Sequence, residues 1–191
     1  MKKPVCIIVA AIIAIAIGGV LAVFLLGKPK HEAVRETVDT MDILVPAGKG
    51  KMPVVFLAHN GGQTKEFWGD FPEYLESQGY AVVNMGWTDM RGGMDFKKNI
   101  AKVMERYGKV MDFKRVSFVG GCHGAVKLLA AIDAQLPIAP TSLVLLSMSE
   151  QYSPPSKHVP ILGVRTLRDN LGPGYVAIQQ KVYESTVTEP K

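Results

Sequence analysis

The feature that most constrains the fold is an alternation of short apolar segments with segments of helical character. Each apolar segment is a continuous run rich in β-branched and aliphatic residues, and the runs span residues 41–46, 53–58, 80–85, 115–119, 142–147 and 159–164. Continuous apolar strands separated by helices indicate a parallel sheet that is buried on both faces. The chain is therefore expected to form an α/β domain, a three-layer αβα sandwich with a mostly parallel sheet.

The segments between these runs predict helices over residues 64–78, 95–107 and 125–135. Gly79 provides the end of the first helix, and Pro72 within it is expected to kink or divide that helix. Three aromatic residues lie near predicted strand ends, and either core packing or an apolar pocket explains them: Phe67, Trp68 and Trp87.

The most informative stretch is the turn after the apolar run at 115–119, where residues 120–124 read Gly-Gly-Cys-His-Gly. A G-x-C-x-G turn between a strand and a helix is the nucleophile-elbow pattern, with cysteine in place of serine. Its glycines remove side chains that would clash where helix and strand pack closely, and a helix N-terminus favours the thiolate form of Cys122. The alternative is a plain glycine turn around a small buried cysteine. His123 is expected to be structural or to line a pocket, not to act as a base.

These motifs resemble those of the α/β-hydrolase superfamily, and Cys122 makes the chain similar to its dienelactone hydrolase branch. The loop at residues 59–62, His-Asn-Gly-Gly, resembles the oxyanion loop of that superfamily. The resemblance implies an oxyanion hole built from the backbone N–H groups of His123 and of Asn60 or Gly61.

The same resemblance implies a catalytic acid in the loop after the run at 159–164, where Asp169 is the candidate. In the alternative interpretation, Asp169 caps the next helix. Glu150, which follows the run at 142–147, is the fallback acid.

In this superfamily the catalytic histidine follows the acid along the chain. No histidine follows Asp169, because the chain's four are His31, His59, His123 and His158. Three explanations stay open: a C-terminally truncated hydrolase, which we favour; a catalytically inactive binding or scaffold protein with the same fold; or another base, such as His59 or His158, with the further option that Cys122 needs none.

Residues 5–26 contain no charged residue and no proline. At 1.5 Å per residue, such a helix covers a hydrocarbon core of about 30 Å. We expect a single-pass anchor over residues 1–27, a linker or short juxtamembrane helix over 28–38, and the hydrolase-like domain over 39–191. A cleaved secretory signal and a buried helix are the alternatives. The basic N-terminus favours a domain outside the cytoplasm.

The chain carries a net charge of +5. Several basic residues recur at helical spacing and form either a solvated helix face or a patch for anionic lipid: Lys98, Lys102, Arg106 and Lys109. No nucleic-acid-binding motif accompanies them, so no nucleic-acid partner is expected.

The chain has two cysteines, Cys6 and Cys122. A disulfide between them is not expected because Cys6 lies in the apolar segment, and no Cys/His spacing indicates a metal site or a cofactor. A thiol redox role for Cys122 is a weaker alternative, since no resolving cysteine is present.

The sequence thus predicts a membrane-anchored hydrolase of small-molecule carboxylic esters or lactones, with Cys122 as nucleophile and Asp169 as acid. Its main alternative is an inactive scaffold with the same fold.

Overall fold

A seven-stranded mixed sheet forms the centre of the molecule. The computed structural model describes residues 30–87, 95–147 and 159–164. The strand order is β2-β3-β6-β5-β7-β8-β9, and β3 pairs antiparallel with both of its neighbours while the other pairs are parallel. The strands are β2 (Val34–Val38), β3 (Met41–Val45), β5 (Met52–Ala58), β6 (Ala81–Met85), β7 (Met111–Gly121), β8 (Ser142–Leu146) and β9 (Ile161–Val164). A separate two-stranded pair joins β1 (Lys30–His31) to β4 (Gly48–Lys49).

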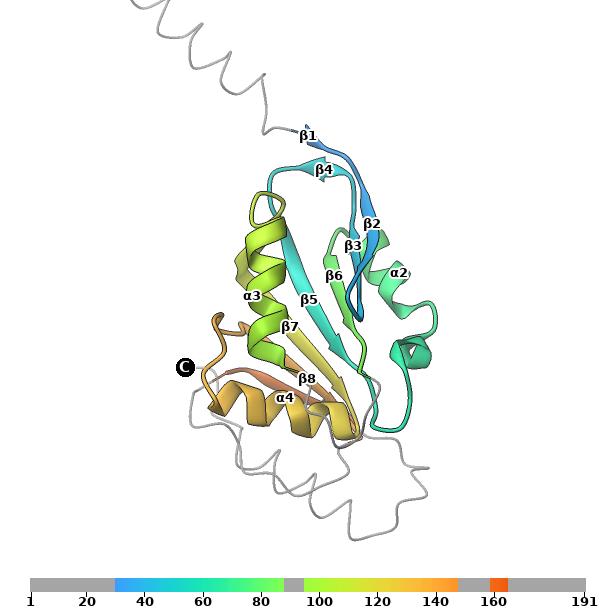
Figure 1. Cartoon of the computed structure of the whole chain (residues 1–191), viewed down its shortest axis with the longest axis vertical. Helices are drawn as coiled ribbons and strands as arrows, with labels where there is room; N and C mark the ends of the chain where they lie inside the picture. The colour runs from blue at the N-terminus through green and yellow to red at the C-terminus, as the bar shows by residue number, and fades with distance from the viewer. Residues whose placement is uncertain (1–29, 88–94, 148–158, 165–191) are drawn as a thin grey trace, which may run out of the picture.

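Helices cover both faces of this sheet (Figure 1). The helices α3 (Phe96–Tyr107) and α4 (His123–Asp133) pack on one face, over a large cluster that includes Phe56 and Phe118. The short η1 (Lys65–Trp68) and α2 (Phe71–Ser77) lie on the other face, over a smaller cluster that includes Leu57 and Val82. Successive strand residues point to opposite faces, so the two clusters alternate along β5. The expected αβα sandwich is present.

The helix expected over residues 64–78 is divided into η1 and α2. Gly69, with φ 51°, follows η1, and Pro72 lies in the first turn of α2. Proline has no N–H to donate and suits a first helical turn, so it starts a new helix instead of continuing the previous one. Gly79, with φ 86°, follows the end of α2 as expected.

The linker or short juxtamembrane helix expected over residues 28–38 is wrong at two places, because Lys30–His31 is strand β1 and Val34–Val38 is strand β2. Strand β2 pairs along its whole length with β3, and its residues alternate between half-buried and exposed. A polar edge strand has no continuous apolar run, so the sequence pattern of this segment does not indicate a strand. Two other elements start earlier than expected: β7 at Met111 and α4 at His123.

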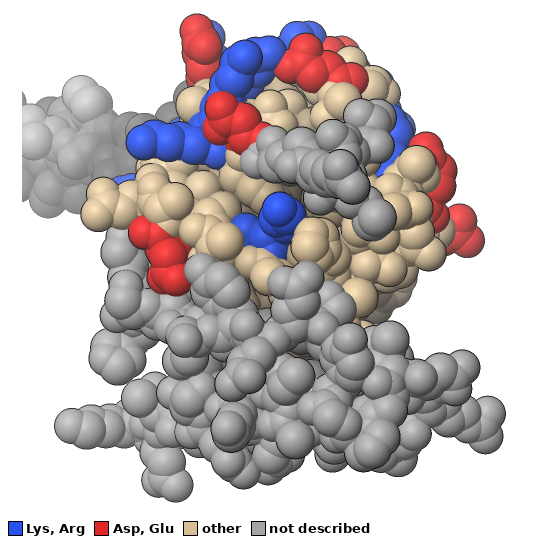
Figure 2. All heavy atoms as spheres, turned by 60° about the horizontal axis from the view of Figure 1, so that its bottom comes forward, with Lys and Arg blue, Asp and Glu red and all other residues tan. Residues whose placement is uncertain are grey.

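Two of the basic residues on α3 form ion pairs with acidic residues. Lys102 forms an ion pair with Asp39, and Arg106 forms one with Glu36. In Figure 2, basic and acidic side chains lie next to one another over the upper part of the described surface. These pairs favour a solvated helix face over a patch devoted to anionic lipid.

Among the residues that the structure describes, no helix is long and apolar enough to cross a bilayer. The proposed anchor at residues 5–26 lies outside the described residues.

Candidate active site at the β7–α4 turn

Cys122 occupies a strained turn between β7 and α4. Its backbone has φ 49° and ψ −112°, a conformation that residues other than glycine rarely adopt. The Cys122 N–H donates to the Leu146 carbonyl at 2.7 Å, and the Ala125 N–H donates to the Cys122 carbonyl at 3.1 Å. These bonds join the turn to the end of β8 and to the first turn of α4. Cys122 is partly exposed and carries a free thiol.

The glycines two residues before and after Cys122 are sterically required. A Cβ on Gly120 would lie 2.5 Å from Ala125 Cα, inside the first turn of α4. A Cβ on Gly124 would lie 2.3 Å from the carbonyl oxygens of Ala58 and His59, at the end of β5. Only hydrogen fits at either position, so strand, turn and helix can pack this closely only with the G-x-C-x-G pattern.

The loop after β5 lies directly against the start of α4. A Cβ on Gly61 would be 3.0 Å from Cδ2 and 3.2 Å from Cβ of His123. The loop is held by a turn in which the Gln63 N–H donates to the Asn60 carbonyl at 3.3 Å. The structure therefore brings together the three residues that were expected to frame an oxyanion: Asn60, Gly61 and His123.

His59 is fully buried, and both of its ring nitrogens have partners. Nδ1 donates to the Asn60 carbonyl at 2.7 Å, and Nε2 accepts from the Trp87 N–H at 3.2 Å, which fixes the tautomer. The ring stacks on Trp87 with centroids 3.7 Å apart, and burial lowers the pKa of His59. A neutral histidine with both nitrogens engaged is not available to Cys122 as a base, so His59 supports the loop instead.

The aromatic residues near the strand ends divide between the two expected roles. Trp68 is buried in the core, and Trp87 packs on His59. Phe67 is 41% exposed and sits against the backbone next to Cys122, because a Cβ on Gly121 would lie 2.7 Å from Phe67 Cε1. Sequence reasoning missed the stacking of Trp87 on His59, since the two residues lie on different strand ends and no local pattern links them.

Three other candidates from the sequence lie outside the described residues: Glu150, His158 and Asp169. In the part of the chain that the structure does describe, no three His, Cys, Asp or Glu side chains are grouped to hold a metal ion.

Comparison with solved structures identifies the fold. The chain superposes on the S-formylglutathione hydrolase FrmB of Staphylococcus aureus with a TM-score of 0.59 at 13% identity, over 84% of this chain and 86% of that one. It superposes on TT1662 of Thermus thermophilus with a TM-score of 0.59 at 13% identity, over 82% and 83%. Esterase B of Lactobacillus rhamnosis gives 0.45 at 19% identity, and the chain spans 59% of its length, less than two thirds.

No protein-family model matches the sequence, and no curated protein matches it either. The structural likeness and the mixed sheet flanked by helices on both faces agree with each other. The chain has the α/β-hydrolase fold.

Proposed function

We propose that the chain is a membrane-anchored acyl hydrolase that cleaves small carboxylic esters or lactones, with Cys122 as nucleophile. The observation that carries the proposal is the backbone of Cys122, which has positive φ in a turn between a central strand and a helix N-terminus. Strain of this kind persists only where the surroundings enforce it, and it presents a nucleophile above the sheet edge. A cysteine at this position of the turn resembles the nucleophile of the dienelactone hydrolase branch.

In the proposed reaction, Cys122 Sγ attacks the carbonyl carbon of the ester and forms a tetrahedral intermediate. The backbone N–H groups of His123 and of Asn60 or Gly61 donate to its oxyanion. The intermediate expels the alcohol, which takes up the thiol proton, and leaves a thioester on Cys122. Water then attacks the thioester, releasing the acid and restoring the thiol.

The proton transfers need a base that is not His59, whose ring nitrogens are both engaged. Asp169 remains the proposed acid and His158 a proposed base. Phe67, exposed beside Cys122, supplies an apolar wall that suits an apolar acyl group. We further propose that residues 5–26 anchor the chain and hold the domain outside the cytoplasm.

The test uses the full chain in a non-ionic detergent, with p-nitrophenyl esters as substrates and fluorophosphonate and iodoacetamide as active-site probes. Cys122→Ala and Cys6→Ser form a matched pair, because each removes one of the two cysteines. We expect fast labelling and ester turnover in the unchanged chain and in Cys6→Ser. Both are lost in Cys122→Ala, with turnover falling by about a hundredfold or more.

The opposite result is slow labelling, as for an ordinary free thiol, with the same ester turnover in all three proteins. That result would reject the hydrolase and favour a scaffold protein with the same fold.

A further inference from the structure

A cavity of about 340 Å³ lies on the face of the sheet that η1 and α2 cover. Its walls come from β2, β3, β6 and the two helical segments. None of the described residues that line it belongs to the turn at Cys122 or to the loop at residues 59–62. Its volume is at the lower end of the range for small-molecule sites.

The floor of this cavity contains a row of polar side chains on three adjacent strands. Thr37 on β2 is in register with Asp42 on β3, and Asp42 is in register with Asn84 on β6. Residues in register point to the same face, so the three side chains are neighbours. The Thr37 hydroxyl donates to Asp42 Oδ1 at 2.7 Å, and Lys65 Nζ of η1 donates to the same oxygen at 2.6 Å.

Asn84 is the member of this row whose hydrogen bonding is incomplete. The residue is 5% exposed, and its Nδ2 donates to the Lys65 carbonyl at 3.1 Å, which fixes the orientation of the amide. Its Oδ1 is buried and has no partner among the described residues. A buried carbonyl oxygen without a donor is costly, so a donor from a bound molecule would stabilise this site.

The side chains that line the cavity include more carboxylates than basic groups. Arg35 is paired with Glu76, and Lys65 is paired with Asp42. None of the ion pairs in the described part of the chain involves Glu66 or Glu73, which also line the cavity. A hydrogen bond with Thr64 lowers the pKa of Glu66, so its carboxylate stays charged at neutral pH.

We propose that this cavity binds a small organic cation with N–H donors, an ammonium or a guanidinium compound. Its N–H groups donate to Asn84 Oδ1 and to Asp42, and Glu66 and Glu73 balance its charge. The Lys65 side chain, about a quarter exposed, holds its ammonium at Asp42 Oδ1, and a change of its rotamer makes Asp42 available to the ligand. The ligand's cation then takes the place of the Lys65 ammonium at Asp42.

The experiment is a calorimetric titration of the full chain in a non-ionic detergent. The probe is agmatine, which carries a guanidinium and an ammonium group, and the comparison probe is tetramethylammonium, a cation without N–H donors. Agmatine is expected to bind saturably, and tetramethylammonium at least about tenfold more weakly, because it cannot donate to Asn84 Oδ1.

Three variants locate the site. Asn84→Leu removes the acceptor at similar volume and should weaken agmatine binding by about tenfold or more. Glu73→Gln on the exposed rim should weaken it by about threefold. Glu105→Gln removes the same charge from the exposed surface of α3 and should bind agmatine like the unchanged chain.

The proposal is overturned by a lack of saturable agmatine binding in the millimolar range, or by equal binding of both probes. Equal affinity in folded Asn84→Leu and in the unchanged chain would also overturn it. If circular dichroism shows that Asn84→Leu does not fold, the comparison of Glu73→Gln with Glu105→Gln decides, and equal affinities reject the site. Ester turnover plays no part in this readout, so failure of the hydrolase proposal would not affect it.

Discussion

The conformation of Cys122 depends on neighbours that leave its backbone no alternative. The Cys122 N–H donates a hydrogen bond to the Leu146 carbonyl of β8. The helix α4 that follows packs so closely on β5 and β7 that Gly120 and Gly124 have no room for a Cβ. A residue with φ near +50° that is not glycine carries a cost of about 1–3 kcal/mol. The packing of α4 offsets this strain, so substitutions that loosen the packing should also change the backbone conformation of the turn.

Gly124→Ala should destabilise the domain by about 1–3 kcal/mol. The new Cβ would lie 2.3 Å from two carbonyl oxygens at the end of β5, and backbone oxygens cannot move aside as a flexible side chain can. The measurement is urea unfolding of the full chain in detergent, followed by circular dichroism. Labelling of Cys122 by iodoacetamide should change in parallel, because the shift of α4 alters the turn.

Gly163→Ala is the matched control, since a Cβ on Gly163 has no heavy atom of the described residues within 4 Å and the residue has ordinary φ. It should leave the unfolding free energy within about 0.5 kcal/mol of the unchanged chain. Equal stability of the two variants would mean that α4 and β5 are not packed as closely as described.

At the scale of residues, the sequence predicted where the turn and the loop of the candidate site lie, but not which side chains contact one another there. The turn at Cys122 and the loop at Asn60 and Gly61 were predicted because short local patterns with fixed backbone demands encode them. The pairing of His59 with Trp87 was not predicted, because it joins two strand ends that are adjacent only in the folded sheet.

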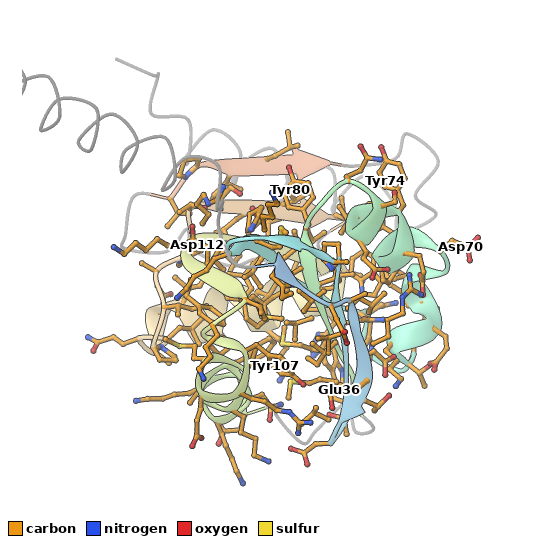
Figure 3. All side chains as sticks on the ribbon, turned by 90° about the horizontal axis from the view of Figure 1, so that it is seen from above. Glu36, Asp70, Tyr74, Tyr80, Tyr107 and Asp112 are labelled. Carbon is orange, nitrogen blue, oxygen red and sulfur yellow. The ribbon has the colours of Figure 1, made fainter. Side chains whose placement is uncertain are left out.

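At the scale of elements, α3 is joined to the edge strand β2 by a polar cluster. Tyr107, 4% exposed, donates its hydroxyl to Glu36 Oε1 at 2.7 Å, and Arg106 forms an ion pair with the same carboxylate. Figure 3 labels Tyr107 on α3 and Glu36 on β2. Burial, followed by the hydrogen bond to Glu36, raises the pKa of Tyr107. The cluster fastens the edge strand β2 to α3, in addition to the packing of Val34 and Val38 against the core.

A double-mutant cycle with Tyr107→Phe and Glu36→Leu should give a coupling energy of about 1 kcal/mol in urea unfolding. The hydroxyl is buried and its acceptor is charged, so loss of either partner leaves the other poorly bonded. Tyr107→Phe alone should destabilise by about 1 kcal/mol.

The matched cycle uses Asp112→Asn and Arg115→Gln, an exposed ion pair at the start of β7. Its coupling energy should be below about 0.5 kcal/mol, because solvent screens exposed pairs. Couplings of the same size in both cycles would show that the Tyr107–Glu36 bond does not secure β2.

Most elements were predicted from the sequence, and three strands were missed: β2 and the two-residue strands β1 and β4. The failure to predict β2 has a physical reason. The central strands are buried on both faces and therefore appear as apolar runs. Strand β2 lies at the edge, and its side chains Arg35 and Glu36 bond to opposite layers, one to α2 and one to α3. Its strand character comes from pairing with β3 across a short turn, and composition does not reveal such pairing.

At the scale of the molecule, the strand order brings the candidate site together. Ala58 at the end of β5 is in register with Gly120 of β7, and Gly121 is in register with Leu146 of β8. Parallel neighbours end at the same edge, so the loop after β5 and the turn after β7 emerge side by side (Figure 1). The sequence predicted a parallel sheet but not this order, because order depends on crossovers between segments far apart in the chain.

The proposed anchor gives a prediction for the whole chain. Expressed in full, the protein should remain with the membrane pellet after extraction with alkaline carbonate. Ile13→Arg together with Ile15→Arg should release it, because each charge at the centre of a spanning helix costs about 3 kcal/mol. The variant with Ile13→Leu and Ile15→Leu is the control, and it should stay in the pellet.

The mass of the recovered chain separates the remaining alternatives for residues 5–26. An anchor leaves a membrane-bound chain whose mass includes these residues, and accessibility of Cys122 to an impermeant maleimide in intact cells then reports whether the domain lies outside the cytoplasm. A cleaved signal would instead yield a shorter chain in the soluble fraction, since removal of the apolar segment also removes the attachment. A soluble chain of full mass would contradict both and would require the segment to be buried by other parts of the protein. The polar and charged residues that follow the segment favour the first outcome, because Lys28, two residues after its end, suits a helix end at the membrane surface.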